Sequence, residues 1–206
     1  MCGIAGHIDF KGQSFDQKKI INAANSLIHR GPDASGFWHE KGCSFAHRRL
    51  SIHDLSDNGS QPMFSSDRRY VCILNGEIYN FKKLKEKLSN NGHKWKGTSD
   101  TEVLIQGWVI WSEAVLDLID GMFSFAIWDR QKRKLFIARD RIGEKPLYYH
   151  NGSQGFGFAS RPNALLELFP TMSKAYDQQA LRYFLEAGYV PAPHSIYQEI
   201  KKLPAA

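Results

Sequence analysis

The sequence predicts an α+β fold in which antiparallel sheets are covered by helices. Short apolar runs that are typical of strands dominate the middle of the chain, and the later runs are spaced as hairpins. Helical patterns interrupt these runs without alternating regularly with them, which disfavours a Rossmann-type sheet. The chain has 206 residues, of which 42% are hydrophobic and 23% charged, so it can bury a substantial core without disulfides or metals.

The strands are identified from apolar runs that turn residues bound. The run YVCIL at residues 70–74 is almost continuously apolar, as expected for a strand buried on both faces. Polar residues 129–134 are expected to form the turn of one hairpin, and Asn151 with Gly152 the turn of a second. Strands are thus predicted over residues 3–10, 45–52, 70–74, 123–128, 135–138, 146–149 and 156–159.

Helices are predicted where a capping residue precedes apolar residues spaced three or four apart. Ser14 and Ser99 each start a capping-box pattern, with Gln or Glu three residues later. Asp177 is expected to cap a last helix that ends at Gly188. The expected apolar faces are Ile20, Ala24, Leu27 and Ile28; Val103, Leu104 and Trp108; and Leu181, Phe184 and Leu185.

The formal net charge is +6, and the basic residues are scattered along the chain. The densest run lies on a predicted helix and is interpreted as a solvated face; it contains Lys82, Lys83, Lys85 and Lys87, opposite Phe81, Leu84 and Leu88. A nucleic-acid surface would need a broader basic stripe with exposed aromatic residues, so no nucleic-acid partner is expected. An acidic partner or an anionic substrate stays open.

The start of the chain has no signal-peptide pattern, and no apolar stretch approaches the roughly 20 residues that a membrane span needs. Cys2, Cys43 and Cys72 do not form a disulfide pattern, and the latter two are expected to fill strand interiors. We therefore expect a cytoplasmic setting without a membrane partner. The chain has neither His-Glu-x-x-His nor Cys-x-x-Cys spacing, so no metal site is expected.

Cys2 is a candidate nucleophile because it follows the initiator Met1. Removal of Met1 would give one residue a thiol and a free α-amine. Such an amine has an ordinary pKa of about 7.7–8.0, so it can accept a proton near neutrality. A thiol beside a base is an activated nucleophile, although Cys2 taken alone could be an incidental buried residue.

Further motifs occur in a fixed order: Cys2-Gly-Ile-Ala-Gly6, His29-Arg-Gly-Pro-Asp33, Arg49-Leu-Ser-Ile52, Asn75-Gly-Glu-Ile-Tyr-Asn80 and Ser99-Asp100. Together they resemble the blocks of class II glutamine amidotransferases, which are N-terminal-nucleophile hydrolases. The motif NGEIYN and the tail GYVPAP…IKKLP most resemble the glutamine-hydrolysing asparagine synthetases. The resemblance covers residues 2 to about 204 and implies a four-layer αββα sandwich of two antiparallel sheets.

The resemblance implies that Cys2 attacks the side-chain amide of glutamine, while Asn75 and Gly76 form the oxyanion hole. Amide hydrolysis passes through a tetrahedral oxyanion that needs preorganised donors, which an Asn side chain and a Gly backbone N–H can supply. The alternative for Asn75 and Gly76 is a simple turn after the strand at residues 70–74.

Glutamine also presents a carboxylate and an ammonium. The resemblance assigns the carboxylate to Arg49, since Arg can bind it with two N–H groups, and the ammonium to Asp100 and Glu77. Backbone carbonyls near Ser51 and Ile52 are further candidates. The alternatives are a surface arginine at position 49 and a carboxylate at position 100 that only stabilises a helix N-terminus.

Residues Arg30, Gly31, Pro32 and Asp33 are expected to form a rigid loop that shapes the site or acts as a lid. A structural ion pair between Arg30 and Asp33 is the alternative.

We expect a glutaminase domain at residues 1–190 and a linker at residues 191–206 that leads to a synthetase domain. ATP and Mg²⁺ are expected only in that absent domain, because the chain has no Ser-Gly-Gly-x-Asp-Ser segment. The expected partners are glutamine and the synthetase domain, and a second copy of the chain stays a candidate. The alternatives are a non-catalytic partner-binding module, an amidotransferase of hexosamine or purine synthesis, and a thiol protease.

Overall fold

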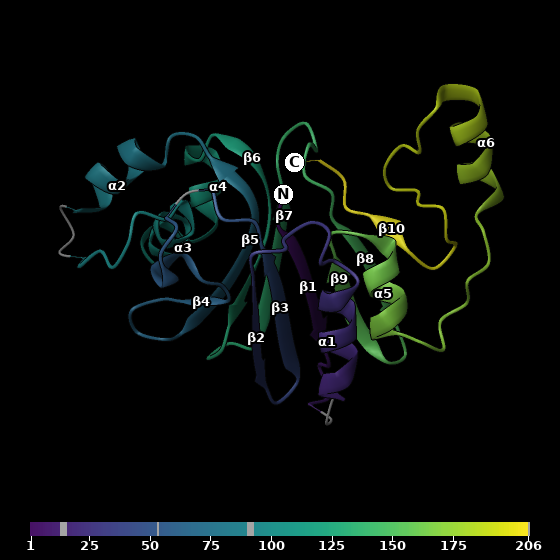
Figure 1. Cartoon of the computed structure of the whole chain (residues 1–206), viewed down its shortest axis with the longest axis horizontal. Coiled ribbons are helices and arrows are strands. Elements are labelled where there is room, and N and C mark those ends of the chain that lie inside the picture. Colours follow the sequence, from purple (N-terminus) through teal and green to yellow (C-terminus); the bar gives the residue numbers. More distant parts are fainter. Residues whose placement is uncertain (13–15, 53, 90–92, 206) are drawn as a thin grey trace.

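A computed structural model describes residues 1–12, 16–52, 54–89 and 93–205. The strands form two antiparallel sheets that lie face to face (Figure 1). The first sheet contains, in spatial order, β10 (Lys201–Lys202), β8 (Tyr148–Gly152), β9 (Gly155–Ala159), β1 (Gly3–Ile8), β3 (Cys43–Arg49) and β2 (Ala34–Glu40). The second contains β4 (Met63–Phe64), β5 (Tyr70–Ile78), β6 (Gly121–Asp129) and β7 (Lys134–Arg139).

Helices cover the outer face of each sheet. The six-stranded sheet carries α1 (Gln17–Asn25) and α5 (Pro162–Leu168), whose buried side chains share one cluster with those of β1 and β3. The four-stranded sheet carries α2 (Phe81–Ser89), α3 (Asp100–Trp111) and the short α4 (Val115–Leu118). The remaining helix, α6 (Gln178–Ala187), lies at the periphery, as Figure 1 shows. The predicted four-layer αββα sandwich is confirmed.

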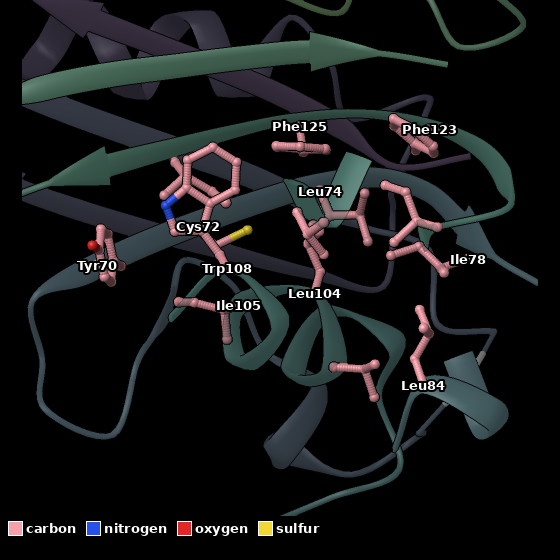
Figure 2. Packing of buried hydrophobic residues seen from close by; sticks show 14 of the residues in the cluster. Tyr70, Cys72, Leu74, Ile78, Leu84, Leu104, Ile105, Trp108, Phe123 and Phe125 are labelled. Atoms are coloured by element: carbon pink, nitrogen blue, oxygen red, sulfur yellow. The ribbon is translucent and has the colours of Figure 1, made fainter. Parts of the chain in front are cut away.

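The buried apolar cluster between the helices and the four-stranded sheet shows why α3 packs on that sheet. Leu104, Ile105 and Trp108 lie on the side of α3 that faces β5 and β6, and Figure 2 shows them against Cys72 and Phe125. Trp108 and Phe125 meet nearly edge to face, with ring centroids 6.3 Å apart. This packing fixes the N-terminus of α3, and therefore Asp100, against the strands.

The layer between the sheets is built by alternation along the strands. Side chains of a strand point alternately to its two faces, so odd and even positions enter different layers. Val71 and Ile73 of β5 pack between the sheets, whereas Cys72 and Leu74 pack under the helices. Cys43 and Cys72 are buried and unbridged, which confirms that they fill strand interiors.

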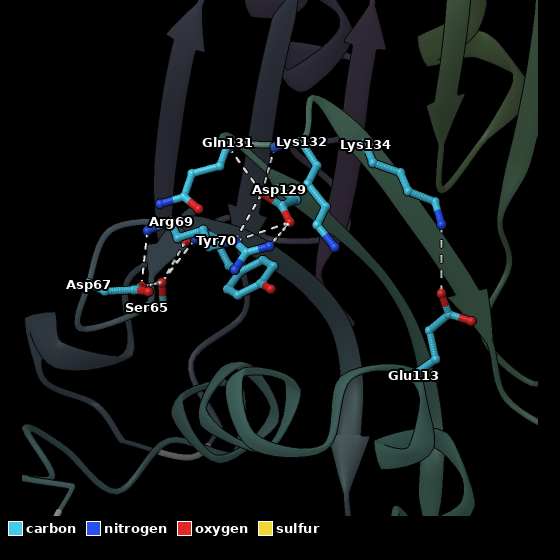
Figure 3. Close-up of polar contacts among 9 residues, drawn as sticks. All are labelled: Ser65, Asp67, Arg69, Tyr70, Glu113, Asp129, Gln131, Lys132 and Lys134. Carbon is cyan, nitrogen blue, oxygen red and sulfur yellow. Dashed lines mark hydrogen bonds and ion pairs between the residues drawn. The ribbon is translucent and has the colours of Figure 1, made fainter.

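A polar network fixes one end of the β5–β6 pair. Asp129 lies opposite Tyr70 in the register, and its carboxylate accepts the Arg69 guanidinium at 2.6 Å (Figure 3). The same carboxylate accepts the backbone N–H groups of Gln131 and Lys132, both at 3.0 Å, which closes the turn to β7. The same pairing register continues along β5 and β6, so it also fixes the positions of Asn75 and Gly76.

The predicted strands differ from the observed ones mainly at their ends. The apolar run at residues 70–74 continues to Ile78, so Asn75 and Gly76 lie inside β5, and the alternative of a simple turn is wrong. The run predicted over residues 45–52 begins at Cys43 and ends at Arg49. The second hairpin turns at residues 153–154, so the turn predicted at Asn151 and Gly152 is wrong. The sequence pattern did not predict β2.

The helix caps follow the predictions in part. Ser99 accepts the N–H of Thr101 at 3.1 Å, but Glu102 accepts the N–H groups of Lys96 and Gly97 instead of closing a capping box. Asp16 caps α1, and Ser14 lies outside the described residues. Asp177 and Gly188 bound α6 as predicted. Its apolar face, with Leu181, Phe184 and Leu185, is exposed in this chain.

The linker expected at residues 191–206 does not extend away from the domain. Lys201–Lys202 pair with β8, and Ile200 is fully buried. Leu203 donates its N–H to the carbonyl of Leu147 at 2.8 Å. Residues 200–203 of this segment are therefore packed on the six-stranded sheet. No helix among the described residues is long and apolar enough to cross a membrane.

Gly76 is required by the close approach of β6. Its φ of 143° is unfavourable for other residues, and a Cβ there would overlap the Met122 carbonyl and lie 2.6 Å from the Phe123 Cα. Gly188 also has a positive φ, of 76°, but nothing lies within 4 Å of its Cβ position. We expect Gly188→Ala to cost about 1 kcal/mol and Gly76→Ala at least about 2 kcal/mol more, measured by urea unfolding. Equal losses would contradict this steric assignment.

His47 makes the stability depend on pH. Burial between the sheets lowers its pKa from 6.5 to about 4, against the opposing effect of its bond to the Leu74 carbonyl. Between these values the unfolded chain binds a proton that the folded chain does not, so stability falls as the pH drops from 6.5 to 4. The loss should reach about 3 kcal/mol, since one pKa unit corresponds to about 1.4 kcal/mol.

The measurement is urea unfolding of the wild type and of His47→Gln between pH 7 and 4.5. Gln keeps a donor for the Leu74 carbonyl but does not titrate, so the variant should lose less stability over this range. His7, whose pKa burial also lowers, contributes to both proteins and cancels in the comparison. Parallel curves for the two proteins would show that His47 does not carry the effect.

Candidate active site

Strand register brings the predicted residues to one end of the sandwich. β1 and β3 are antiparallel neighbours that pair Gly3 with Arg48, so Cys2 lies beside Arg49 at the edge of the six-stranded sheet. Asn75 lies on the face of β5 that meets this sheet. The N-terminus of α3 adds Asp100.

These residues line one open pocket with about 670 Å³ of empty space. Its wall contains most of the predicted site: Cys2, Arg49, Ile52, Asn75, Gly76, Glu77 and Asp100. Ser51, Arg30, Gly31 and Asp33 do not line it. The wall also includes residues that were not predicted to bind substrate: Met1, Leu50, Gly59, Gln61, Leu74, Ser99, Thr101, Met122 and Lys145.

The thiol of Cys2 contacts the chain just after β3. The backbone N–H of Leu50 lies 3.4 Å from its Sγ, and the thiol donates to the Leu50 carbonyl at 3.7 Å. Burial raises the pKa of this thiol above its ordinary value, although the Leu50 contact and the nearby Arg49 lower it. The thiol therefore keeps its proton at neutral pH and needs a base to become a nucleophile.

Asn75 is fully buried on the pocket wall. Its Nδ2 donates to the Ser124 hydroxyl at 3.4 Å, and its Oδ1 is buried with no hydrogen-bond partner. The nitrogen and oxygen of an amide are assigned from such partners, so the weak Ser124 contact allows the opposite orientation. In that orientation the buried atom without a partner is an N–H donor, the kind of group that an oxyanion needs.

Arg49 is a buried arginine with 7% of its surface exposed, so the alternative of a surface strand residue is wrong. Its guanidinium donates to the carbonyl of Ser56 at 3.0 Å and to that of Asp54. Neighbouring Arg48 points the other way and donates to the Ala24 carbonyl at the end of α1. Position 49 is thus the one that presents a guanidinium to the pocket.

Asp100 is the first residue of α3, and its Oδ2 accepts the N–H of Ile78 at 3.0 Å. A carboxylate at a helix N-terminus is stabilised by the helix dipole. Because Asp100 also lines the pocket, together with Glu77, it can meet a ligand ammonium from the same position.

The loop after α1 holds the backbone next to the pocket without lining the pocket itself. Arg30 donates to the carbonyl of Cys2 at 2.9 Å, and Asp33 accepts the N–H of Ser51 at 2.8 Å. Gly31 packs so closely on β3 that a Cβ would lie 2.6 Å from the Arg49 backbone nitrogen. Among the described residues no ion pair joins Arg30 to Asp33, so that alternative is wrong, and both side chains hold backbone next to the site.

Lys145 and Gln61 were not among the predicted site residues, because they reach the pocket through contacts with segments distant in the sequence. Lys145 is buried, and its Nζ contacts the sulfur atoms of Met122 at 2.9 Å and Met1 at 3.4 Å. Gln61 bridges two walls of the pocket: it accepts the N–H of Leu74 at 2.6 Å and donates to the Thr101 hydroxyl at 3.1 Å. Both residues come from loops whose course depends on the whole fold.

The chain is similar to known proteins over its whole length. A family model described as a glutamine amidotransferase domain matches residues 1–206. The chain belongs to this family. Asparagine synthetase [glutamine-hydrolyzing] 3 of Bacillus subtilis (strain 168) is 37% identical over 207 residues, which cover 98% of this chain and 33% of that protein. The asparagine synthetase [glutamine-hydrolyzing] of Zea mays is 39% identical over 167 residues, covering 80% and 28%.

This amidotransferase domain therefore spans about a third of the length of such relatives. Among solved structures, the glutamine phosphoribosylpyrophosphate amidotransferase from B. subtilis, complexed with ADP and GMP, superposes with a TM-score of 0.68. It is 20% identical, and the match covers 81% of this chain and 43% of that one, so it supports the fold alone.

The amidotransferase domain offers a matched pair of arginines for testing the carboxylate site. We expect Arg49→Lys to raise the KM for glutamine about tenfold or more, because Lys cannot bind a carboxylate with two N–H groups and hold the Asp54 and Ser56 carbonyls as well. Arg48→Lys makes the same change on the next residue, outside the pocket, and should leave KM unchanged. Steady-state glutamate release measures both, and equal effects would contradict the assignment.

Proposed function

We propose that this domain hydrolyses glutamine to glutamate and ammonia, with Cys2 as the nucleophile. The observation that supports this most is the convergence of Cys2, Arg49, Asn75 and Asp100 on one pocket from separate strands and a helix. The pocket offers a guanidinium for the carboxylate of glutamine and a carboxylate for its ammonium. The Cys2 thiol and the Asn75 amide can then act on the side-chain amide of glutamine.

The chemistry requires Met1 to be removed. The free α-amine of Cys2 takes the proton of the thiol while sulfur attacks the amide carbon, and the oxyanion is held by Asn75 and the Gly76 N–H. When the tetrahedral intermediate collapses, the α-ammonium gives its proton to the amide nitrogen, the carbon–nitrogen bond breaks, and the nitrogen leaves as ammonia. Water then hydrolyses the thioester, which gives glutamate and restores the thiol.

We place the use of ammonia outside these 206 residues. The relatives with the printed name asparagine synthetase are about three times as long, which supports a following domain that amidates a carboxylate. The sequence has no Ser-Gly-Gly-x-Asp-Ser segment for ATP and Mg²⁺, so the ATP-dependent step belongs to that domain. The three free cysteines fit a reducing, cytoplasmic compartment.

The test combines intact mass with glutamate release on the same sample. Protein without Met1 should release glutamate from glutamine, and Cys2→Ala should abolish this activity, since no other thiol lines the pocket. Cys43→Ala is the matched control and should stay active. Glutamate release by a sample that retains Met1, at the rate of the processed protein, would contradict the role of the amine. A processed sample that binds glutamine without releasing glutamate would favour a partner-binding module.

A further inference from the structure

The loop between β3 and β4 holds the arginine that would bind the glutamine carboxylate. The Arg49 guanidinium donates to the backbone carbonyls of Asp54 and Ser56 on this loop. Gly59, on the same loop, lets the guanidinium approach, because a Cβ there would lie 3.0 Å from the Arg49 Cζ and closer still to Nη2. The position of the guanidinium therefore depends on the shape of the loop.

The side chain of Asp54 fixes that shape. Its Oδ1 accepts the N–H of Ser56 at 3.1 Å and the Ser56 hydroxyl at 2.5 Å. The backbone at Asp54 has a φ of 49°, in the left-handed region that Asp tolerates better than most residues. The bonds with Ser56 lower the pKa of the Asp54 carboxyl, so it is ionised at neutral pH.

The second oxygen of Asp54 contacts the segment that precedes α3. Oδ2 accepts the backbone N–H of Thr98 at 2.6 Å. Thr98 immediately precedes Ser99, the N-cap of α3, and Asp100, the carboxylate that would bind the glutamine ammonium. The loop and the segment before α3 come together at Gly97, where a Cβ would overlap Oδ2 of Asp54 and lie 2.9 Å from the Asn58 Cβ.

We propose that Asp54 is a positioning residue that sets the separation between Arg49 and Asp100 and thereby selects substrates with both an α-carboxylate and an α-ammonium. The inference rests on the proposed function of the pocket. It adds that one carboxylate, which does not line the pocket, links the loop that holds Arg49 to the segment that leads into Asp100. The thiol of Cys2 contacts Leu50 and the α1 loop holds its backbone, so its reactivity does not require Asp54.

The test compares two covalent reagents that both alkylate Cys2 in protein without Met1. A diazo ketone analogue of glutamine keeps the α-carboxylate and α-ammonium, whereas iodoacetamide has neither. In Asp54→Asn, we expect inactivation by the diazo ketone to slow about tenfold or more, because an amide replaces the charge-assisted acceptor of the Thr98 N–H. Alkylation by iodoacetamide should keep its wild-type rate, and glutamine KM should rise about tenfold with kcat changed little.

Asp57→Asn is the matched control, since it makes the same charge change on the same loop. The described structure gives the Asp57 side chain no hydrogen bond, and Asp57 does not line the pocket, so both reagents should react at wild-type rates. Gly97→Ala approaches the contact from the opposite side, because its methyl group would displace the Asp54 carboxylate. Gly97→Ala should also slow inactivation by the diazo ketone and leave alkylation by iodoacetamide unchanged. It replaces Asp54→Asn in the test if that variant does not fold.

Equal slowing of both reagents would overturn the proposal, since it would mean that Asp54 acts on the thiol or on the fold. Unchanged rates with both reagents in Asp54→Asn or Gly97→Ala would overturn it as well. The wild type reports separately on the proposed function. If iodoacetamide labels its Cys2 but the diazo ketone does not react, the pocket does not recognise glutamine, and both the function and the inference fail.

Discussion

Apolar side chains from the two sheets meet in one buried layer, and the position of each residue in the pocket follows from that contact. His47 crosses the layer to donate to the Leu74 carbonyl, so the strand that ends in Arg49 is tied directly to the strand that carries Asn75. Neither sheet contains a complete site. Cys2 and Arg49 come from one sheet and Asn75 and Gly76 from the other, so loss of the layer would separate them.

Much of this arrangement could be predicted from the sequence, because short motifs at strand ends carry the chemistry. The apolar neighbours of Cys72 indicated a strand interior, and the capping pattern indicated the start of α3, where Asp100 lies. The paired strands around residues 129–134 were recognisable because both are apolar and the turn between them is polar. These signals are local: each depends on neighbouring residues in the sequence and not on contacts with distant segments.

The features that could not be predicted depend on contacts between distant segments. β2 has the sequence ASGFWHE, in which small and polar residues hide the alternation, and it forms because β3 offers a pairing edge. Asn75 and Gly76 look like a turn until β6 pairs with them. The sequence suggests an ion pair between Arg30 and Asp33. In the structure, Arg30 instead donates to the Cys2 carbonyl and Asp33 accepts the Ser51 N–H. In each case a long-range partner outweighs the local preference.

The structure with Met1 in place shows what its proposed removal changes. The sulfur of Met1 lies 3.4 Å from the Lys145 ammonium and 3.8 Å from the Arg30 guanidinium, so an uncharged thioether sits between two cations. The strands, the loop after α1 and the Arg49 contacts are all formed around it, so excision does not require refolding. It exchanges the amide nitrogen of Cys2 for an amine, on a residue whose carbonyl Arg30 already holds. The proposed mechanism depends on that exchange, because an amide nitrogen cannot accept the proton of the buried thiol, whereas an amine can.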